Sequence, residues 1–229
     1  MKELSKTQKG LSCVLKTTVI LSAVIGTFLS WYAGRESFMG GSTVFMYFTI
    51  QSNIAIAIIS MIGLIMLMRK GCFSDLWYII KFVGTVSITL TGVVFCFVLA
   101  PTLGDAAWNI QNILTHVVVP IAAILDFFVT GISSSIKYKN TFWGIVPPLL
   151  YAIYAGIGYR MNWQFAEGYN YPYFFLNWGS PAEAFGFTNE LPFMGCMWWI
   201  LLLLTGMIIV GYIYLLIIKA FQKLLRMEK

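Results

Sequence analysis

The sequence predicts an all-α membrane protein: a single bundle of six transmembrane helices whose N- and C-termini are both cytoplasmic. Of the 229 residues, 59% are hydrophobic and only 10% are charged, whereas soluble domains average about 25% charged residues. A helix needs roughly 20 apolar residues to cross a membrane, and the chain contains six such stretches. A soluble catalytic domain is therefore excluded.

The predicted spans are bounded by turn-forming or charged residues. They cover approximately residues 13–32, 45–68, 77–99, 112–131, 142–159 and 194–218. The one long outer loop, residues 160–193, lies between the fifth and sixth spans. All of these segments belong to one domain, residues 1–229.

The distribution of lysine and arginine predicts the orientation. Twelve of these residues fall at the N-terminus, in the second and fourth connections or in the C-terminal tail, and only Arg35 and Arg160 fall on the opposite side. The twelve are Lys2, Lys6, Lys9, Lys16, Arg69, Lys70, Lys137, Lys139, Lys219, Lys223, Arg226 and Lys229. Positive residues stay on the cytoplasmic side, so both termini are expected there. The net charge of +6 is thus a topology signal and does not predict nucleic-acid binding.

No pattern in the chain predicts a metal site or an organic cofactor. The cysteines are Cys13, Cys72, Cys96 and Cys196, and none forms a Cys-x-x-Cys pair. Cys96 and Cys196 could both lie near the outer face, but free thiols are favoured over a disulfide between them. No protein partner is indicated.

Polar side chains inside a membrane are the place to look for function, because each is unfavourable there unless it is paired. The second span opens with Thr49, Gln51, Ser52 and Asn53. Residues four apart share one helical face, so Thr49 and Asn53 are expected side by side with Ser52 next to them.

The fourth span carries a second polar pair at the same spacing, Asn112 and His116. Both spans run inward from the outer side, and Thr49 and His116 each lie about four residues past the outer boundary of their span. At about 1.5 Å per residue, both would lie some 6 Å below the interface. We therefore expect the hydroxyl and the imidazole at one level, 3–4 Å apart if the helices are neighbours.

A hydroxyl beside a neutral imidazole can act as a nucleophile with a general base, attacking an acyl carbon. Amides of Asn53, Asn112 or Gln51 could orient the ring or stabilise an oxyanion. Ser52 is an alternative nucleophile. A histidine bonded to a neighbouring helix is also commonly simple interhelical contact, so a non-catalytic binder, a transporter or a structural factor remain alternatives.

Two other features complete the analysis. Lys81 and Asp126 lie at similar depth in the third and fourth spans and are predicted to form a buried structural ion pair. The outer loop contains a dense set of aromatic residues, among them Trp163, Tyr171 and Tyr173. These form either an interfacial belt or a lid that lines an apolar pocket above Thr49.

The motifs Phe-Thr-Ile-Gln-Ser-Asn at 48–53, the segment from His116 to Pro120 and Tyr-Pro-Tyr-Phe at 171–174 resemble the androgen-induced protein family of six-span membrane proteins, including its bacterial relatives. The resemblance implies a threonine hydrolase that cleaves fatty acid esters of hydroxy fatty acids, with Thr49 and His116 as the catalytic residues.

The expectation is therefore an intramembrane esterase in a bacterial plasma membrane. Its substrate would be a lipid-like fatty-acyl ester, and its other partners the surrounding membrane lipids.

Overall fold

The computed structural model describes residues 4–37, 40–69, 73–131 and 136–227. Lys2, Lys70, Cys72 and Lys229 lie outside these ranges. The described chain is helical and contains no β-strand, and six of its helices are long and apolar enough to cross a membrane. The predicted all-α fold of an integral membrane protein is confirmed.

The six spans are assembled from α-helices and from short 3-10 or π segments that join them. In chain order they are α1 (Lys6–Gly34), η1 (Gly41–Met46), α2 (Phe48–Met68), α3 (Asp75–Val94), η2 (Phe95–Leu99), α4 (Ala100–Leu103), η3 (Gly104–Ala107), α5 (Ile110–Ile113), η4 (Leu114–Val118), α6 (Val119–Thr130), η5 (Tyr138–Ile145), α7 (Val146–Arg160), η6 (Phe174–Leu176) and α8 (Cys196–Met227).

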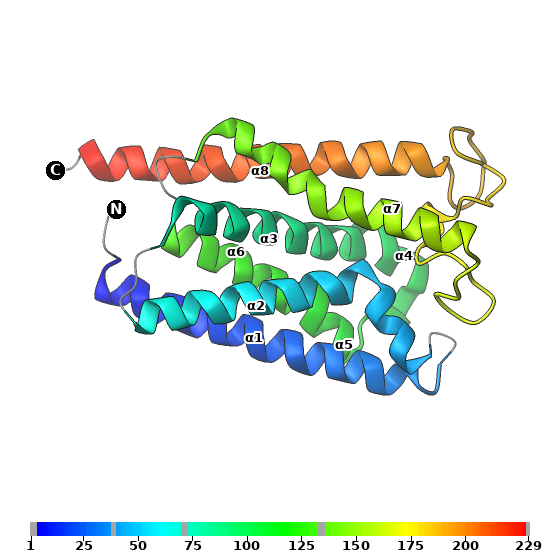
Figure 1. Cartoon of the computed structure of the whole chain (residues 1–229), viewed down its shortest axis with the longest axis horizontal. Helices are drawn as coiled ribbons and strands as arrows, with labels where there is room; N and C mark the ends of the chain where they lie inside the picture. Colours follow the sequence, from blue (N-terminus) through cyan, green and yellow to red (C-terminus); the bar gives the residue numbers. More distant parts are fainter. Residues whose placement is uncertain (1–3, 38–39, 70–72, 132–135, 228–229) are drawn as a thin grey trace.

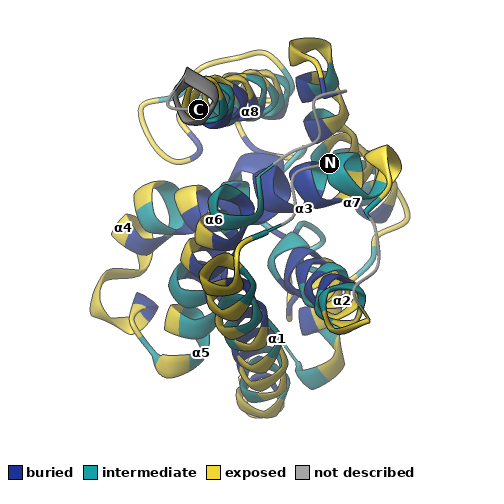
Figure 2. Cartoon of the chain, turned by 90° about the vertical axis from the view of Figure 1, so that its left-hand side faces the viewer, coloured by how far each residue is buried: buried dark blue, intermediate teal, exposed yellow. Residues whose placement is uncertain are grey.

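Helix α3 occupies the middle of the bundle, between α2 on one side and α7 and α8 on the other (Figure 1). Helix α1 packs on α2 and α6, and α3 packs on the same two helices. The buried residues of the bundle gather where these helices approach one another (Figure 2). Helix α1 begins and α8 ends at the same end of the bundle, hereafter the terminal end. The long aromatic loop lies at the opposite end, hereafter the loop end.

Several helices extend beyond the predicted spans because polar side chains complete their ends. Helix α1 begins at Lys6, seven residues before the predicted boundary, since Ser5 and Gln8 form a reciprocal capping box. The third span runs from Asp75, capped by Ser74, to Ala107. A hydropathy pattern detects the apolar centre of a helix and misses such polar first turns.

Two π-helical turns interrupt the third and fourth spans at the loop end. In η2 the amide of Ala100 bonds to the carbonyl of Phe95, and in η4 the amide of Val119 bonds to that of Leu114. A proline lies two residues after the end of each of these turns, Pro101 after η2 and Pro120 after η4. Proline has no amide hydrogen and its ring clashes with the carbonyl four residues earlier, so the chain widens by one residue at each place.

A buried ionic cluster joins three helices near the terminal end. The predicted pair is confirmed, with Lys81 Nζ of α3 2.8 Å from Asp126 Oδ2 of α6. Lys16 of α1 also binds Asp126, and Ser12 donates to the other carboxylate oxygen over 2.5 Å. Lys16 is 2% exposed, and its place in this cluster was not predicted from the sequence, where it was counted only among the charges on the cytoplasmic side. Lys81 additionally donates to Thr130.

This cluster holds two ammonium groups and one carboxylate, which makes the consequences of mutation unequal. Asp126→Ala leaves two buried cations unpaired and is expected to destabilise the protein by about 3–5 kcal/mol. Lys16→Met leaves a balanced pair and should cost far less. The measurement is thermal unfolding in detergent, with the exposed Asp105 changed to alanine as control. Equal stability of the Asp126→Ala and Asp105→Ala proteins would contradict this account.

Candidate active site

The hydroxyl of Thr49 is not bonded to the backbone of its own helix, because Thr49 lies in the first turn of α2. Threonines inside membrane helices usually bond back to the carbonyl four residues earlier, and Thr85, Thr89 and Thr115 do so over 2.8 Å. Thr49 is the second residue of its helix, so the residue four positions earlier, Phe45, lies outside α2, and its carbonyl accepts from Gln51 instead. The hydroxyl of Thr49 faces His116 and Tyr173.

His116 reaches Thr49 from the π-helical turn η4. The distance from Thr49 Oγ1 to His116 Nε2 is 3.2 Å, within the range expected from the sequence. The other ring nitrogen, Nδ1, lies 3.1 Å from the carbonyl oxygen of Asn112. A carbonyl can only accept a hydrogen bond, so the hydrogen-bond network assigns the hydrogen to Nδ1. The lone pair of Nε2 then points at the Thr49 hydroxyl.

Two further neighbours fix the imidazole. The hydroxyl of Thr115 donates its hydrogen to Gln111 and leaves its lone pairs facing His116 Nδ1 at 3.0 Å. Phe95 stacks on the ring, with centroids 3.9 Å apart and planes 20° from parallel. Phe95 belongs to η2, so the two π-helical turns meet at this contact.

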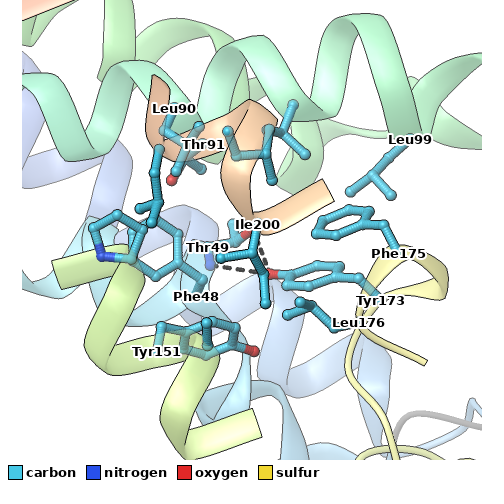
Figure 3. Close-up of a pocket in the computed structure, with 15 residues that line it drawn as sticks. Phe48, Thr49, Leu90, Thr91, Leu99, Tyr151, Tyr173, Phe175, Leu176 and Ile200 are labelled. Atoms are coloured by element: carbon cyan, nitrogen blue, oxygen red, sulfur yellow. Dashed lines mark hydrogen bonds between the residues drawn. The ribbon is translucent and has the colours of Figure 1, made fainter. Parts of the chain in front are cut away.

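An apolar pocket opens beside Thr49 at the loop end (Figure 3). Its walls leave about 570 Å³ of space when the open side is counted, whereas the cavity itself measures about 60 Å³. Side chains from α2, α3, α7, α8 and the outer loop line it. They are Phe48, Thr49, Leu90, Thr91, Val94, Leu99, Pro148, Tyr151, Ala152, Tyr173, Phe175, Leu176, Ile200, Leu203 and Leu204.

Tyr173 is the loop residue that reaches the nucleophile candidate. Its hydroxyl oxygen accepts the amide hydrogen of Thr49 over 3.4 Å and lies 3.5 Å from Thr49 Oγ1, as the dashed lines in Figure 3 show. Its ring stacks on Phe175, with centroids 5.0 Å apart. Burial raises the pKa of Tyr173, so the phenol keeps its proton and can donate a hydrogen bond into the pocket.

The other polar residues predicted for the second span take structural positions. Ser52 lies 2.7 Å from Thr91 and donates to the carbonyl of Thr49, so it does not face the imidazole. Asn53 donates to the carbonyls of Thr49 and Thr115 and thereby joins α2 to η4. Gln51 is exposed and donates to Phe45 in the turn before the helix.

Asn112 orients the imidazole through its backbone carbonyl, while its side-chain amide donates to Ala107 over 2.9 Å. The side-chain amide of Asn112, predicted to orient the ring or to contact an oxyanion, is thus bonded to a backbone carbonyl in this structure, and its oxyanion role stays a prediction. Trp163 packs against Tyr154, and Tyr171 against Tyr169. Neither Trp163 nor Tyr171 is part of the pocket wall.

Cys96 and Cys196 are free thiols, as favoured by the sequence. Among the described residues, no group of three potential metal ligands comes together.

The sequence analysis missed Phe95 and Thr115. Thr115 is adjacent to His116, but a neighbour in a regular helix points about 100° away, and only the π-helical turn brings its hydroxyl to Nδ1. Phe95 precedes Pro101 by six residues, as Leu114 precedes Pro120. The two prolines near the loop end of these spans were the available signal that the helices are interrupted there.

Comparison with protein families, with curated proteins and with solved structures finds no match for this chain. The function must therefore be argued from the geometry of the site.

The assigned tautomer can be measured because the chain has a single histidine. In protein labelled with ¹⁵N-histidine, NMR in micelles should show Nδ1 protonated and Nε2 unprotonated near neutral pH. The same result is expected for Thr49→Val, since the carbonyl of Asn112 remains as the acceptor for Nδ1. A spectrum with the hydrogen on Nε2 would refute this assignment.

Proposed function

We propose that the protein is an intramembrane esterase in which Thr49 is the nucleophile and His116 the general base. One observation carries the proposal: the unprotonated Nε2 of His116 faces, at 3.2 Å, a threonine hydroxyl that lines an apolar pocket. A hydroxyl and a base in hydrogen-bond contact, with the base held by a third group, are the parts of a nucleophilic acyl transfer. Here the third group is the carbonyl of Asn112 instead of a carboxylate.

In the first step, Thr49 Oγ1 attacks the acyl carbon of the ester while its proton passes to His116 Nε2. The tetrahedral intermediate collapses when the C–O bond to the alcohol breaks, and Nε2 returns the proton to the leaving alkoxide. The products are the free alcohol and an acyl group on Thr49. In the second step a water molecule attacks this acyl group and gives its proton to Nε2. The bond between the acyl carbon and Thr49 Oγ1 then breaks, Nε2 returns the proton to Oγ1, and the fatty acid leaves.

The oxyanion of each intermediate needs a donor that already points at it. Tyr173 provides one, because its protonated hydroxyl lies 3.5 Å from Thr49 Oγ1 and faces the pocket. The first turn of α2 adds a second contribution, since the helix dipole favours negative charge at a helix N-terminus. Both groups favour the oxyanion over the neutral carbonyl of the substrate.

The pocket favours a lipid-like acyl ester. Its walls are almost entirely aliphatic and aromatic, and the site lies where acyl chains of a membrane are within reach. Together with the resemblance described above, this supports a fatty-acyl ester such as a fatty acid ester of a hydroxy fatty acid. The lysine and arginine distribution supports cytoplasmic termini in a bacterial plasma membrane, with the loop end outside. The chemistry uses no metal or organic cofactor.

The first test uses a fluorophosphonate probe and a fatty acid ester of a hydroxy fatty acid. Thr49→Ala and His116→Ala should each lower hydrolysis by at least about 10³-fold, because the two residues act as a unit. Thr49→Ala should also abolish labelling by the probe. Ser52→Ala is the matched control, because it removes a neighbouring hydroxyl that binds Thr91. Its activity should stay within a few-fold of wild type.

Equal hydrolysis and labelling by the wild type, Thr49→Ala and His116→Ala proteins would eliminate the esterase. If none of the three is active but the wild type binds or transports the ester, the pocket is that of a non-catalytic binder or a transporter. Loss of stability alone in both variants would indicate a structural hydrogen bond between the helices.

A second test addresses Tyr173. Removing its hydroxyl in Tyr173→Phe should lower kcat by about 10²-fold, the usual effect of losing one oxyanion donor. KM should change little, since the ring and its contact with Phe175 remain. Tyr171→Phe removes a hydroxyl of the same loop outside the pocket and serves as the control. An unchanged kcat in Tyr173→Phe would assign the oxyanion to other donors.

A further inference from the structure

A second apolar groove runs along the bundle surface from the pocket toward the terminal end. Its walls come from α2, α3 and the junction of η5 with α7, and they leave about 990 Å³ of space, counting the open side. The lining residues are Phe48, Gln51, Ser52, Ala55, Ile59, Ile79, Ile80, Val83, Gly84, Ser87, Trp143, Val146 and Pro147. None of them is ionisable, so the groove suits an uncharged occupant.

The groove opens sideways, toward the surroundings of the bundle. Trp143 is 55% exposed and Ile80 41% exposed, and both form its rims. The groove follows α2 from Phe48 to Ile59, a length of about 16 Å at the helical rise per residue. These residues belong to the part of the helix that crosses the hydrocarbon layer. Lipid chains therefore surround its mouth.

The groove and the pocket at Thr49 are neighbours on the same helices. Phe48 lines both spaces, and its ring packs against Tyr151, with centroids 5.3 Å apart. Behind this ring, Ser52 of the groove is hydrogen-bonded to Thr91 of the pocket over 2.7 Å. The side chain of Phe48 and this hydrogen bond are the partition between the two spaces.

The floor of the groove also contains a polar group that the protein leaves unsatisfied. Ser87 is 6% exposed, and its hydroxyl has no hydrogen-bond partner among the described residues. Buried hydroxyl groups normally have a partner. An occupant that brings an oxygen atom to this level would supply one, whereas a purely hydrocarbon side chain of another protein would not.

We propose that this groove is the lateral entrance and hydrocarbon-chain site for a membrane ester substrate. The chain lies along α2 and α3, Ser87 gives the ester group a hydrogen-bond donor on its way, and rotation of Phe48 admits the ester to Thr49. The substrate assignment rests on the proposed esterase, but the binding of a lipid chain in the groove can be tested without turnover.

Filling the groove tests the proposal kinetically. Ala55 is exposed in the groove, so Ala55→Phe blocks it from outside. The ratio of kcat/KM for p-nitrophenyl palmitate to that for p-nitrophenyl butyrate should fall at least about tenfold, because each methylene kept out of an apolar site costs about fourfold. Ala57→Phe is the matched control, since Ala57 lies on the same helix but lines a different groove, against α1. An unchanged ratio in Ala55→Phe would overturn the proposal.

Photo-crosslinking supplies a readout without hydrolysis. Thr49→Ala protein in lipid nanodiscs is irradiated with a p-nitrophenyl palmitate that carries a diazirine in mid-chain, and the adducts are mapped by mass spectrometry. Adducts should fall on the groove residues of α3 and on Trp143. They should disappear in Thr49→Ala/Ala55→Phe and persist in Thr49→Ala/Ala57→Phe. Adducts spread evenly over the bundle, or unaffected by Ala55→Phe, would overturn the proposal.

The two readouts separate this proposal from the esterase. If the wild type hydrolyses neither ester while the adducts map to the groove and Ala55→Phe removes them, the esterase fails and the lipid-chain site stands. If hydrolysis proceeds while Ala55→Phe changes neither the chain-length ratio nor the adducts, the esterase stands and the groove assignment fails.

Discussion

The carboxylate of Asp126, shared by two lysines from different helices, is the interaction on which the arrangement of the bundle depends. Charges removed from water are tolerated only when they are paired and hydrogen-bonded, so α1, α3 and α6 are held at one depth and one rotation. Asp126 and His116 are ten residues apart on the same span, about 15 Å along the helix axis. The ionic cluster near the terminal end therefore fixes the depth of the imidazole relative to α1 and α3, and α2 brings Thr49 to that level at the loop end.

The π-helical turns that precede the two prolines then determine which way the side chains at the loop end point. Without the extra residue of the π-helical turn η4, the part of the span that precedes this turn would be rotated by about 100° about the helix axis relative to α6. The ring of His116 would then no longer combine its contacts with Thr49, Thr115 and Phe95. Close packing makes the widened turn tolerable. A side chain at Gly92 of α3 would begin 2.9 Å from the carbonyl oxygen of His116, so glycine is required where the two helices approach.

The sequence predicts depth well and lateral neighbours poorly. The level of Thr49 and His116, and that of Lys81 and Asp126, followed from counting residues from the span ends, because a membrane has a fixed thickness. The contact of Lys16 with Asp126 was not predicted, because a lysine near the start of a span usually extends to the interface and nothing in the pattern marks the inward rotation that places it on Asp126. The contact of Tyr173 with Thr49 depends on how a long loop folds back, which no periodicity encodes. For the same reason the sequence could not show that Tyr173 lines the pocket while Trp163 and Tyr171 do not, and it predicted one role for all three.

The hydrogen-bond partners of the polar cluster distinguish a reactive hydroxyl from a structural one. The hydroxyl of Thr115 and the side-chain amides of Asn53 and Asn112 donate to backbone carbonyls, and such bonds are costly to break inside a membrane. Among the described residues, the hydroxyl of Thr49 has no hydrogen bond to a carbonyl, and its partners are the imidazole of His116 and the phenol of Tyr173. A hydrogen bond that serves only to join helices needs no free lone pair, no second donor and no pocket. A lone pair, a second donor and a pocket all lie beside Thr49, because this residue is in the first turn of its helix. This position makes its hydroxyl the polar group best placed to change hydrogen-bond partners when a ligand binds.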